Sequence, residues 1–169
     1  MERRLTLIST LTILCFVLLS KCERDDICVE GTVGTPNLII RFFDANNVNE
    51  PKSVPFMVIN KIDDDYRDYI KRFLIGADSI SIPLKSSQNF TELKFFYNWG
   101  GEDENIDTLK INHDRFDIYL NRACGFIGQY IFKESPIEGI NTEGSWIKSY
   151  KIIKDSILNE ESMHLALYH

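Results

Sequence analysis

The sequence is poor in the residues and motifs from which enzyme sites are built. It contains no nucleophile elbow, no glycine-rich loop that would cradle a phosphate and no CxxC pair. Its three histidines, His113, His164 and His169, have neither the i, i+4 spacing of a metalloprotease nor the paired spacing of a zinc site. We therefore predict a non-enzymatic protein with no cofactor and no bound metal.

The sequence also has fewer basic than acidic residues. The 19 Lys and Arg residues face 25 Asp and Glu residues, so the formal net charge is −6. The first 21 residues carry three cations and one anion, which leaves about −8 on the remainder. An acidic surface does not attract phosphate backbones or anionic lipids. We expect no nucleic-acid partner, and any attachment to a membrane has to come from a lipid.

The apolar run 5–19 is too short to cross a bilayer comfortably, which takes about 20 residues. It follows Arg3 and Arg4, and the two together match the charged and hydrophobic regions of a secretory signal. We predict a signal peptide over residues 1–21. Retention of the segment as a weak anchor is the alternative.

Cys22 stands where the lipid-carrying cysteine of a bacterial lipoprotein follows the signal peptide. The processing enzyme normally requires a small side chain before that cysteine, and here the position holds Lys21, so cleavage by ordinary signal peptidase is an alternative. Two or three acyl chains on Cys22 would hold the protein on a membrane permanently. The acidic segment 23–26 resembles a signal that sends lipoproteins to the outer face of the outer membrane, or is a solvated tether.

Two of the four cysteines are left once location is considered, because Cys15 lies in the leader and Cys22 is the candidate lipid site. In an oxidising envelope, Cys28 and Cys124 are expected to form a disulfide. Two buried thiols are the alternative.

The remaining chain has the length of one domain, which we place at 36–169 behind a tether at 22–35. Short apolar, β-branched and aromatic runs alternate with turn residues, which is typical of an antiparallel β-sandwich rather than of βα units. We predict about eight short strands, within the segments 38–43, 54–59, 80–84, 93–99, 109–111, 116–120, 126–132, 146–153 and 163–168. Pro83 places its strand at an edge or an end.

Two local predictions are more specific. The apolar residues of 66–74 recur at helical spacing behind Asp63-Asp64-Asp65 and before Gly76, so one short helix is expected there. Asn112-His113-Asp114 separates two alternating runs and is expected to be the turn of a β-hairpin.

Aromatic residues are numerous enough to form a platform for a sugar or a partner protein, although packing in the core is the favoured interpretation. They are Phe95, Phe96, Tyr97, Trp99, Trp146 and Tyr150. Asp63-Asp64-Asp65 lacks the spacing of a calcium loop and fits helix capping, and Glu102 and Glu104 fit a solvated turn better than a glycosidase pair. Three Asp-Ser/Thr-aliphatic triplets resemble O-glycosylation acceptors of Bacteroidetes-type bacteria, at 78–80, 107–109 and 155–157.

Four stretches together resemble a family of lipoproteins from Bacteroidetes-type bacteria that is defined only as a domain of unknown function. They are Cys-Glu-Arg-Asp-Asp-Ile-Cys-Val-Glu-Gly at 22–31, the strand at 36–44, Arg-Ala-Cys-Gly-Phe at 122–126, and the ending 146–168 with Met163-His164-Leu165. The resemblance runs from Cys22 to the C-terminus, and Lys21 departs from it. It implies an envelope address and a paired Cys28 and Cys124, but no activity.

These observations lead to one expected function and two alternatives. We expect a lipoprotein of the cell envelope, in the outer membrane, that binds or braces another envelope component, a protein or a glycan. A carbohydrate-binding module that uses the aromatic residues is the first alternative. A hydrolase with an unrecognised site is the second.

Overall fold

The computed structural model describes residues 3, 27–61, 69–73, 75–140 and 142–169. They fall into two compact units. The larger unit spans 33–118 and 127–169, and the smaller one includes 27–32 and 119–126. Cys22 and Asp63-Asp64-Asp65 lie outside the described residues.

In the part of the chain that the structure describes, no helix is both long and apolar enough to span a membrane.

Ten strands occur in the described residues, and two of them are much longer than expected. They are β1 (Leu38–Phe43), β2 (Met57–Lys61), β3 (Tyr69–Phe73), β4 (Ser79–Ile82), β5 (Phe90–Tyr97), β6 (Asn105–Asn121), β7 (Gly125–Glu138), β8 (Ser149–Ile152), β9 (Ser156–Ile157) and β10 (Leu165–Tyr168). One sheet has the order β4-β1-β10-β8, and the other has the order β3-β2-β5-β6-β7-β9. The two sheets pack together, which confirms the mainly β, sandwich-like fold.

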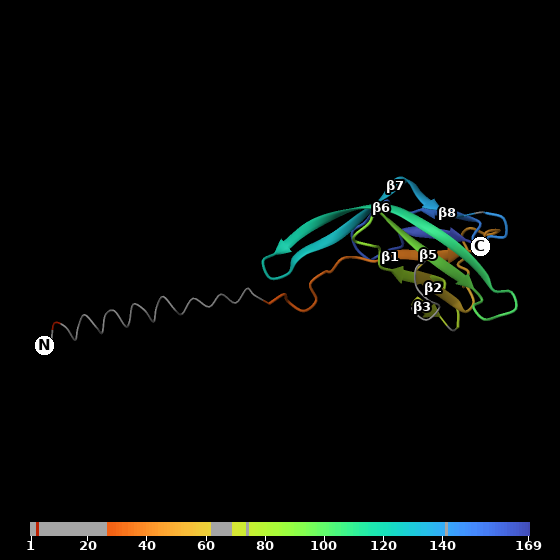
Figure 1. Cartoon of the computed structure of the whole chain (residues 1–169), viewed down its shortest axis with the longest axis horizontal. Coiled ribbons are helices and arrows are strands. Elements are labelled where there is room, and N and C mark those ends of the chain that lie inside the picture. Colours follow the sequence, from red (N-terminus) through yellow and green to blue (C-terminus); the bar gives the residue numbers. More distant parts are fainter. Residues whose placement is uncertain (1–2, 4–26, 62–68, 74, 141) are drawn as a thin grey trace. The chain divides into compact units, whose positions relative to one another are not determined.

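The core lies between the sheets because alternate residues of each strand point to the same face. Leu38, Ile40 and Phe42 of β1 are completely buried, and so are Leu93 and Phe95 of β5. Strands β5 and β6 run side by side, and their pairing extends from Tyr97 and Asn105 to Phe90 and Asn112 (Figure 1). The larger unit therefore has one continuous apolar core.

The four-stranded sheet confirms one expectation and corrects another. β4 is an edge strand that pairs only with β1 in that sheet, as Pro83 directly after it requires. The first and last strands, β1 and β10, are parallel neighbours, with Ile40 opposite Leu165. The sandwich is therefore not purely antiparallel. The apolar alternation of one strand carries no information about the direction of its neighbour, so the sequence pattern did not reveal this pair.

The helix expected within 66–74 is wrong over the residues that the structure describes there. Tyr69–Phe73 is strand β3, which pairs antiparallel with β2 at the edge of the six-stranded sheet. Residues 62–68 and 74 lie outside the described chain. Apolar spacing in so short a run fits two secondary structures, and backbone pairing with β2 selects the strand.

The turn expected at Asn112-His113-Asp114 is also wrong, because these residues lie inside the single 17-residue strand β6. The chain reverses after Asn121, and Gly125 there has a φ of 68° in the left-handed region. After His113 the chain does not turn. Instead, the apolar residues of the strand change from odd-numbered to even-numbered positions. Up to Asn112, β6 pairs with β5, and its odd-numbered residues from 107 to 113 are buried.

Beyond this point the residues 114–119 are all exposed. The pairing with β5 has ended, so no core remains for the odd-numbered face to cover. Phe116 and Ile118 lie on the opposite face of the strand, as their even numbers require.

Candidate functional site

The smaller unit is held together by a disulfide between Cys28 and Cys124, which confirms the predicted pairing. The Cα atoms of the two cysteines are 4.8 Å apart. Asn121 Oδ1 accepts a hydrogen bond from Cys124 N (2.8 Å), and Val29 O accepts one from Thr32 Oγ1 (2.6 Å). We call residues 27–32 and 119–126 the tip, because the latter segment connects β6 to β7.

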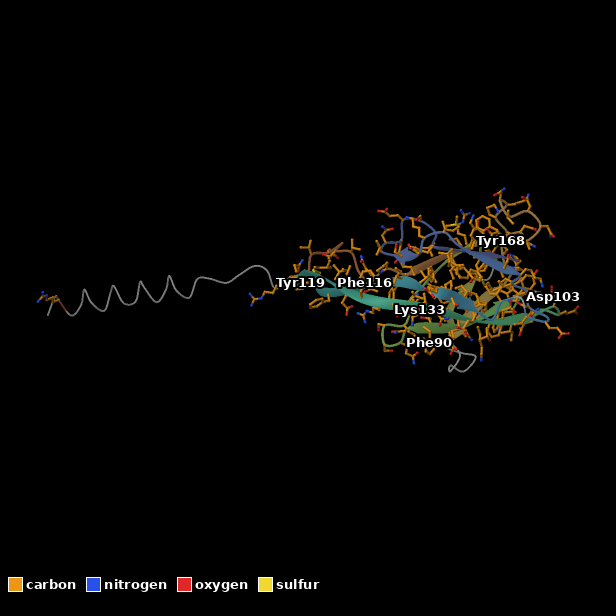
Figure 2. All side chains as sticks on the ribbon, turned by 90° about the horizontal axis from the view of Figure 1, so that it is seen from above. Phe90, Asp103, Phe116, Tyr119, Lys133 and Tyr168 are labelled. Carbon is orange, nitrogen blue, oxygen red and sulfur yellow. A yellow bond between two sulfur atoms is a disulfide. The ribbon has the colours of Figure 1, made fainter. Side chains whose placement is uncertain are left out.

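The tip exposes four large apolar side chains. Ile27 is 81% exposed, Val29 75%, Tyr119 55% and Phe126 66%. Tyr119 and Phe126 meet edge to face with ring centroids 5.2 Å apart, and Tyr119 is labelled near the end of β6 in Figure 2. Single exposed apolar residues are common on proteins. Four within two short segments joined by a disulfide form a surface suited to an apolar partner.

Removing the disulfide with Cys28→Ser and Cys124→Ser together is expected to lower the free energy of unfolding by about 2 kcal/mol. The bridge closes a loop of 96 residues in the unfolded chain. In the folded chain without the bridge, Thr35 Oγ1 still accepts a hydrogen bond from Gly128 N (2.9 Å), which leaves a loop of about 11 residues. The difference is about three doublings of loop length, each worth about 0.6 kcal/mol. Guanidinium unfolding measures it.

An unchanged unfolding midpoint would contradict this prediction. A loss of about 4 to 5 kcal/mol, the full loop-closure value, would show that the bridge also holds parts of the larger unit in place.

His113 is a buried strand residue in the six-stranded sheet. Its Nε2 lies 2.8 Å from Thr91 Oγ1, which also accepts a hydrogen bond from Lys85 N (2.8 Å). The Tyr130 ring packs edge to face on the imidazole at 5.1 Å. Burial is the main cause that lowers the pKa of His113 from 6.5 to about 4, so the ring is neutral at neutral pH.

Thr91 also lines a cavity of about 430 Å³ in the larger unit. The lining further includes Lys61, Leu93 and the segment 83–87. His113 does not line this cavity, but its Nε2 is a hydrogen-bond partner of the Thr91 hydroxyl. Thr91 therefore links His113 to Lys85 in the lining segment 83–87.

The other two histidines are also structural. His164 Nδ1 accepts a hydrogen bond from Ile39 N (3.0 Å), and His164 N donates to Ile39 O (2.9 Å). His169 packs edge to face on the ring of Trp146 at 5.4 Å. Burial lowers the pKa of both His164 and His169. Each histidine has its own set of partners: His113 lies on β6, whereas His164 and His169 directly precede and follow β10.

Core packing is confirmed for three of the six aromatic residues that were candidates for a binding platform. Phe95, Phe96 and Trp146 are buried, and Trp146 Nε1 donates a hydrogen bond to Phe95 O (3.1 Å). Tyr97 is partly exposed and its ring lies 5.5 Å from that of Trp146. Three of the six rings that a carbohydrate platform would use are therefore inside the protein.

Two partly exposed rings remain. The Arg72 guanidinium lies over the ring of Trp99 at 4.6 Å, and Tyr150 on β8 is 37% exposed.

The acidic turn and the hydroxyl residues of the three Asp-Ser/Thr-aliphatic triplets are at the surface, whereas Asp107 of the middle triplet and all three aliphatic residues are buried. Gly100 N donates a hydrogen bond to Glu104 Oε2 (2.6 Å), so Glu104 stabilises the turn between β5 and β6. Ser79 and Thr108 are exposed and Ser156 is partly exposed. Asp107, the first residue of the middle triplet, is buried and accepts hydrogen bonds from Ser145 Oγ and Ile147 N, both at 2.7 Å.

The tip was not predicted as a surface, although the sequence contains a signal for it. Tyr119 lies on the polar face of the alternation in 115–121, where a large aromatic ring is out of place. Ile27 and Val29 flank Cys28 in a segment that otherwise reads as a polar tether. Only the disulfide shows that these residues belong to one cluster.

Comparison with known proteins gives one result. No curated protein and no solved structure matches the chain. The sequence model described as "Family of unknown function (DUF6452)" matches residues 59–169, a stretch that includes β5, β6, β7 and the Cys124 side of the tip. The chain belongs to the DUF6452 family.

Proposed function

We propose that the chain is a non-enzymatic lipoprotein of the cell envelope, anchored through Cys22 in the outer membrane, whose sandwich binds or braces another envelope component. The observation that carries this proposal is the disulfide between Cys28 and Cys124. Such bonds form and persist in exported proteins and are rare where thiols are kept reduced. Cys22 directly follows a leader of the secretory type, and Cys28 lies six residue steps further along the chain.

The net negative charge from Cys22 onward supports attachment by a lipid rather than by basic residues. The proposed resemblance to lipoproteins of Bacteroidetes-type bacteria and the acidic segment 23–26 support the outer membrane as the address.

The proposal predicts that radioactive or alkyne-labelled palmitate is incorporated into the wild-type chain and not into Cys22→Ser. The thiol of Cys22 is the group that takes the diacylglycerol, and serine offers no thiol. The wild-type protein should then float with outer-membrane vesicles in a density gradient, whereas Cys22→Ser should leave that fraction. Cys15→Ser is the matched control and should label like the wild type. Equal labelling of all three, or none, would defeat the anchor.

A further inference from the structure

The exposed apolar side chains of the tip have no cover in the described chain, and their nature limits what the cover can be. Ile27 and Val29 are aliphatic, and Tyr119 and Phe126 are aromatic, with the tyrosine hydroxyl as the one polar group among the four. Tyrosine, with an apolar ring and a polar hydroxyl, is enriched where membranes meet water, and purely apolar side chains such as those of the other three residues can be buried beside it. The composition therefore fits the interface of a lipid bilayer.

Chain length brings the tip to the same bilayer that holds the proposed anchor. Cys28 lies six residue steps after Cys22, and a fully extended chain of that length reaches about 20 Å. The disulfide then fixes Cys124 to Cys28 with 4.8 Å between their Cα atoms. Phe126 follows Cys124 by two residues. A lipid on Cys22 would thus keep the tip within reach of the headgroups, so that all four side chains can contact them.

We propose that the tip dips its four apolar side chains into the interface of the bilayer that carries Cys22. This inference rests on the proposed function, because it requires the lipid. The disulfide is then a positioning device, since it ties the loop between β6 and β7 to the anchored segment. Glu23, Asp25 and Asp26 against Arg24 leave the tether acidic, so contact depends on apolar burial and not on anionic lipids.

The test places a fluorescent reporter in the tip of the lipidated full-length protein. Phe126→Trp is reconstituted into phosphatidylcholine vesicles with brominated acyl chains, which quench only indoles that reach the bilayer. We expect most emission of the introduced indole to be lost relative to unbrominated vesicles, after subtraction of the signal from Trp99 and Trp146. Tyr119→Trp should behave in the same way. Val48→Trp, at an exposed apolar position of the larger unit, is the matched control and should keep its emission.

The mass of each sample separates failure of the inference from failure of the proposed function. If the protein carries lipid at Cys22 and Phe126→Trp is quenched no more than Val48→Trp, the tip faces water or a protein partner, and the inference is overturned. If no lipid is present on Cys22, the proposed function fails and the inference falls with it. Replacing phosphatidylcholine in part by phosphatidylglycerol should not increase quenching. An increase would contradict contact through apolar side chains.

Discussion

Replacing Asp107 by alanine is expected to lower the free energy of unfolding by about 4 kcal/mol, since hydrogen bonds to a charged acceptor contribute roughly 1.5 to 3 kcal/mol each. The Asp107 side chain is buried on β6. Its Oδ2 accepts hydrogen bonds from Ser145 Oγ and Ile147 N, and Oδ1 accepts a longer one from Trp146 N (3.4 Å). Alanine would remove this acceptor from the buried N–H groups of Trp146 and Ile147, whereas Ser145 Oγ keeps Ile147 O as an acceptor at 2.9 Å.

Those hydrogen bonds matter because they hold the segment before β8 against the six-stranded sheet. Trp146 and Ile147 are both part of the core, although they lie outside any strand. Without Asp107, the backbone at 145–147 has to be solvated or displaced, and the two apolar side chains lose their positions. The expected result is a lower guanidinium midpoint and a loss of near-ultraviolet circular dichroism from Trp146.

Two further variants make the measurement specific. Asp107→Asn keeps the shape and one carbonyl oxygen, so it should lose about half as much stability as alanine. Asp117→Ala is the matched control on the same strand, where the carboxylate is exposed and pairs with Arg115 at 2.6 Å. Exposed ion pairs contribute at most about 1 kcal/mol. Equal losses for Asp107→Ala and Asp117→Ala would show that the buried acceptor is not important.

Acidification from pH 7.5 to pH 5 is expected to lower the free energy of unfolding by about 2 kcal/mol through His113 alone. Burial lowers the pKa of His113 to about 4 in the folded protein, from 6.5 in the unfolded chain. Between these two values the unfolded state binds the proton and the folded state does not. Stability is therefore complete above pH 6.5 and is lost as the pH falls toward 4, where the loss from this residue reaches about 3 kcal/mol.

The remaining histidines act in the same direction. Burial also lowers the pKa of His164 and of His169, so the total loss should exceed that from His113. Urea unfolding of wild type and His113→Gln at pH 7.5 and pH 5 measures the contribution. The variant should be less stable at pH 7.5 but should lose about 2 kcal/mol less on acidification. An equal pH dependence in both proteins would contradict a neutral buried His113.

Several elements were predictable because their signals are local. The alternation in 38–43 identifies β1, and Pro83 identifies β4 as an edge strand. The location of the cysteines along the chain left only one pair to form a disulfide, and Cys28 is bonded to Cys124. The need of a small sandwich for bulky side chains predicted that rings such as Phe95 and Trp146 are buried.

Other features depend on contacts with residues far away in the sequence, which an alternation pattern does not identify. The run at 69–73 is a strand because β2 offers it a pairing edge. The shift of apolar parity after His113 resembles a turn in the sequence, but it marks the place where β5 no longer accompanies β6. In the sequence, Asp107 is part of a triplet that resembles an O-glycosylation acceptor, and only folding brings its carboxylate to the backbone of Ile147.

The sequence by itself determined the β-rich character of this protein and its net negative charge, because each follows from composition or from short-range alternation. The pairing of Cys28 with Cys124 was an expectation by elimination of the other two cysteines, and the structure confirmed it. Tertiary structure decided the parallel neighbours β1 and β10, the length of β6 and the buried sites of His113 and Asp107. It also decided that Ile27 and Val29 lie with Tyr119 and Phe126 in one tip. These features require contact between residues far apart in the chain, and no local pattern encodes which distant residue will be the partner.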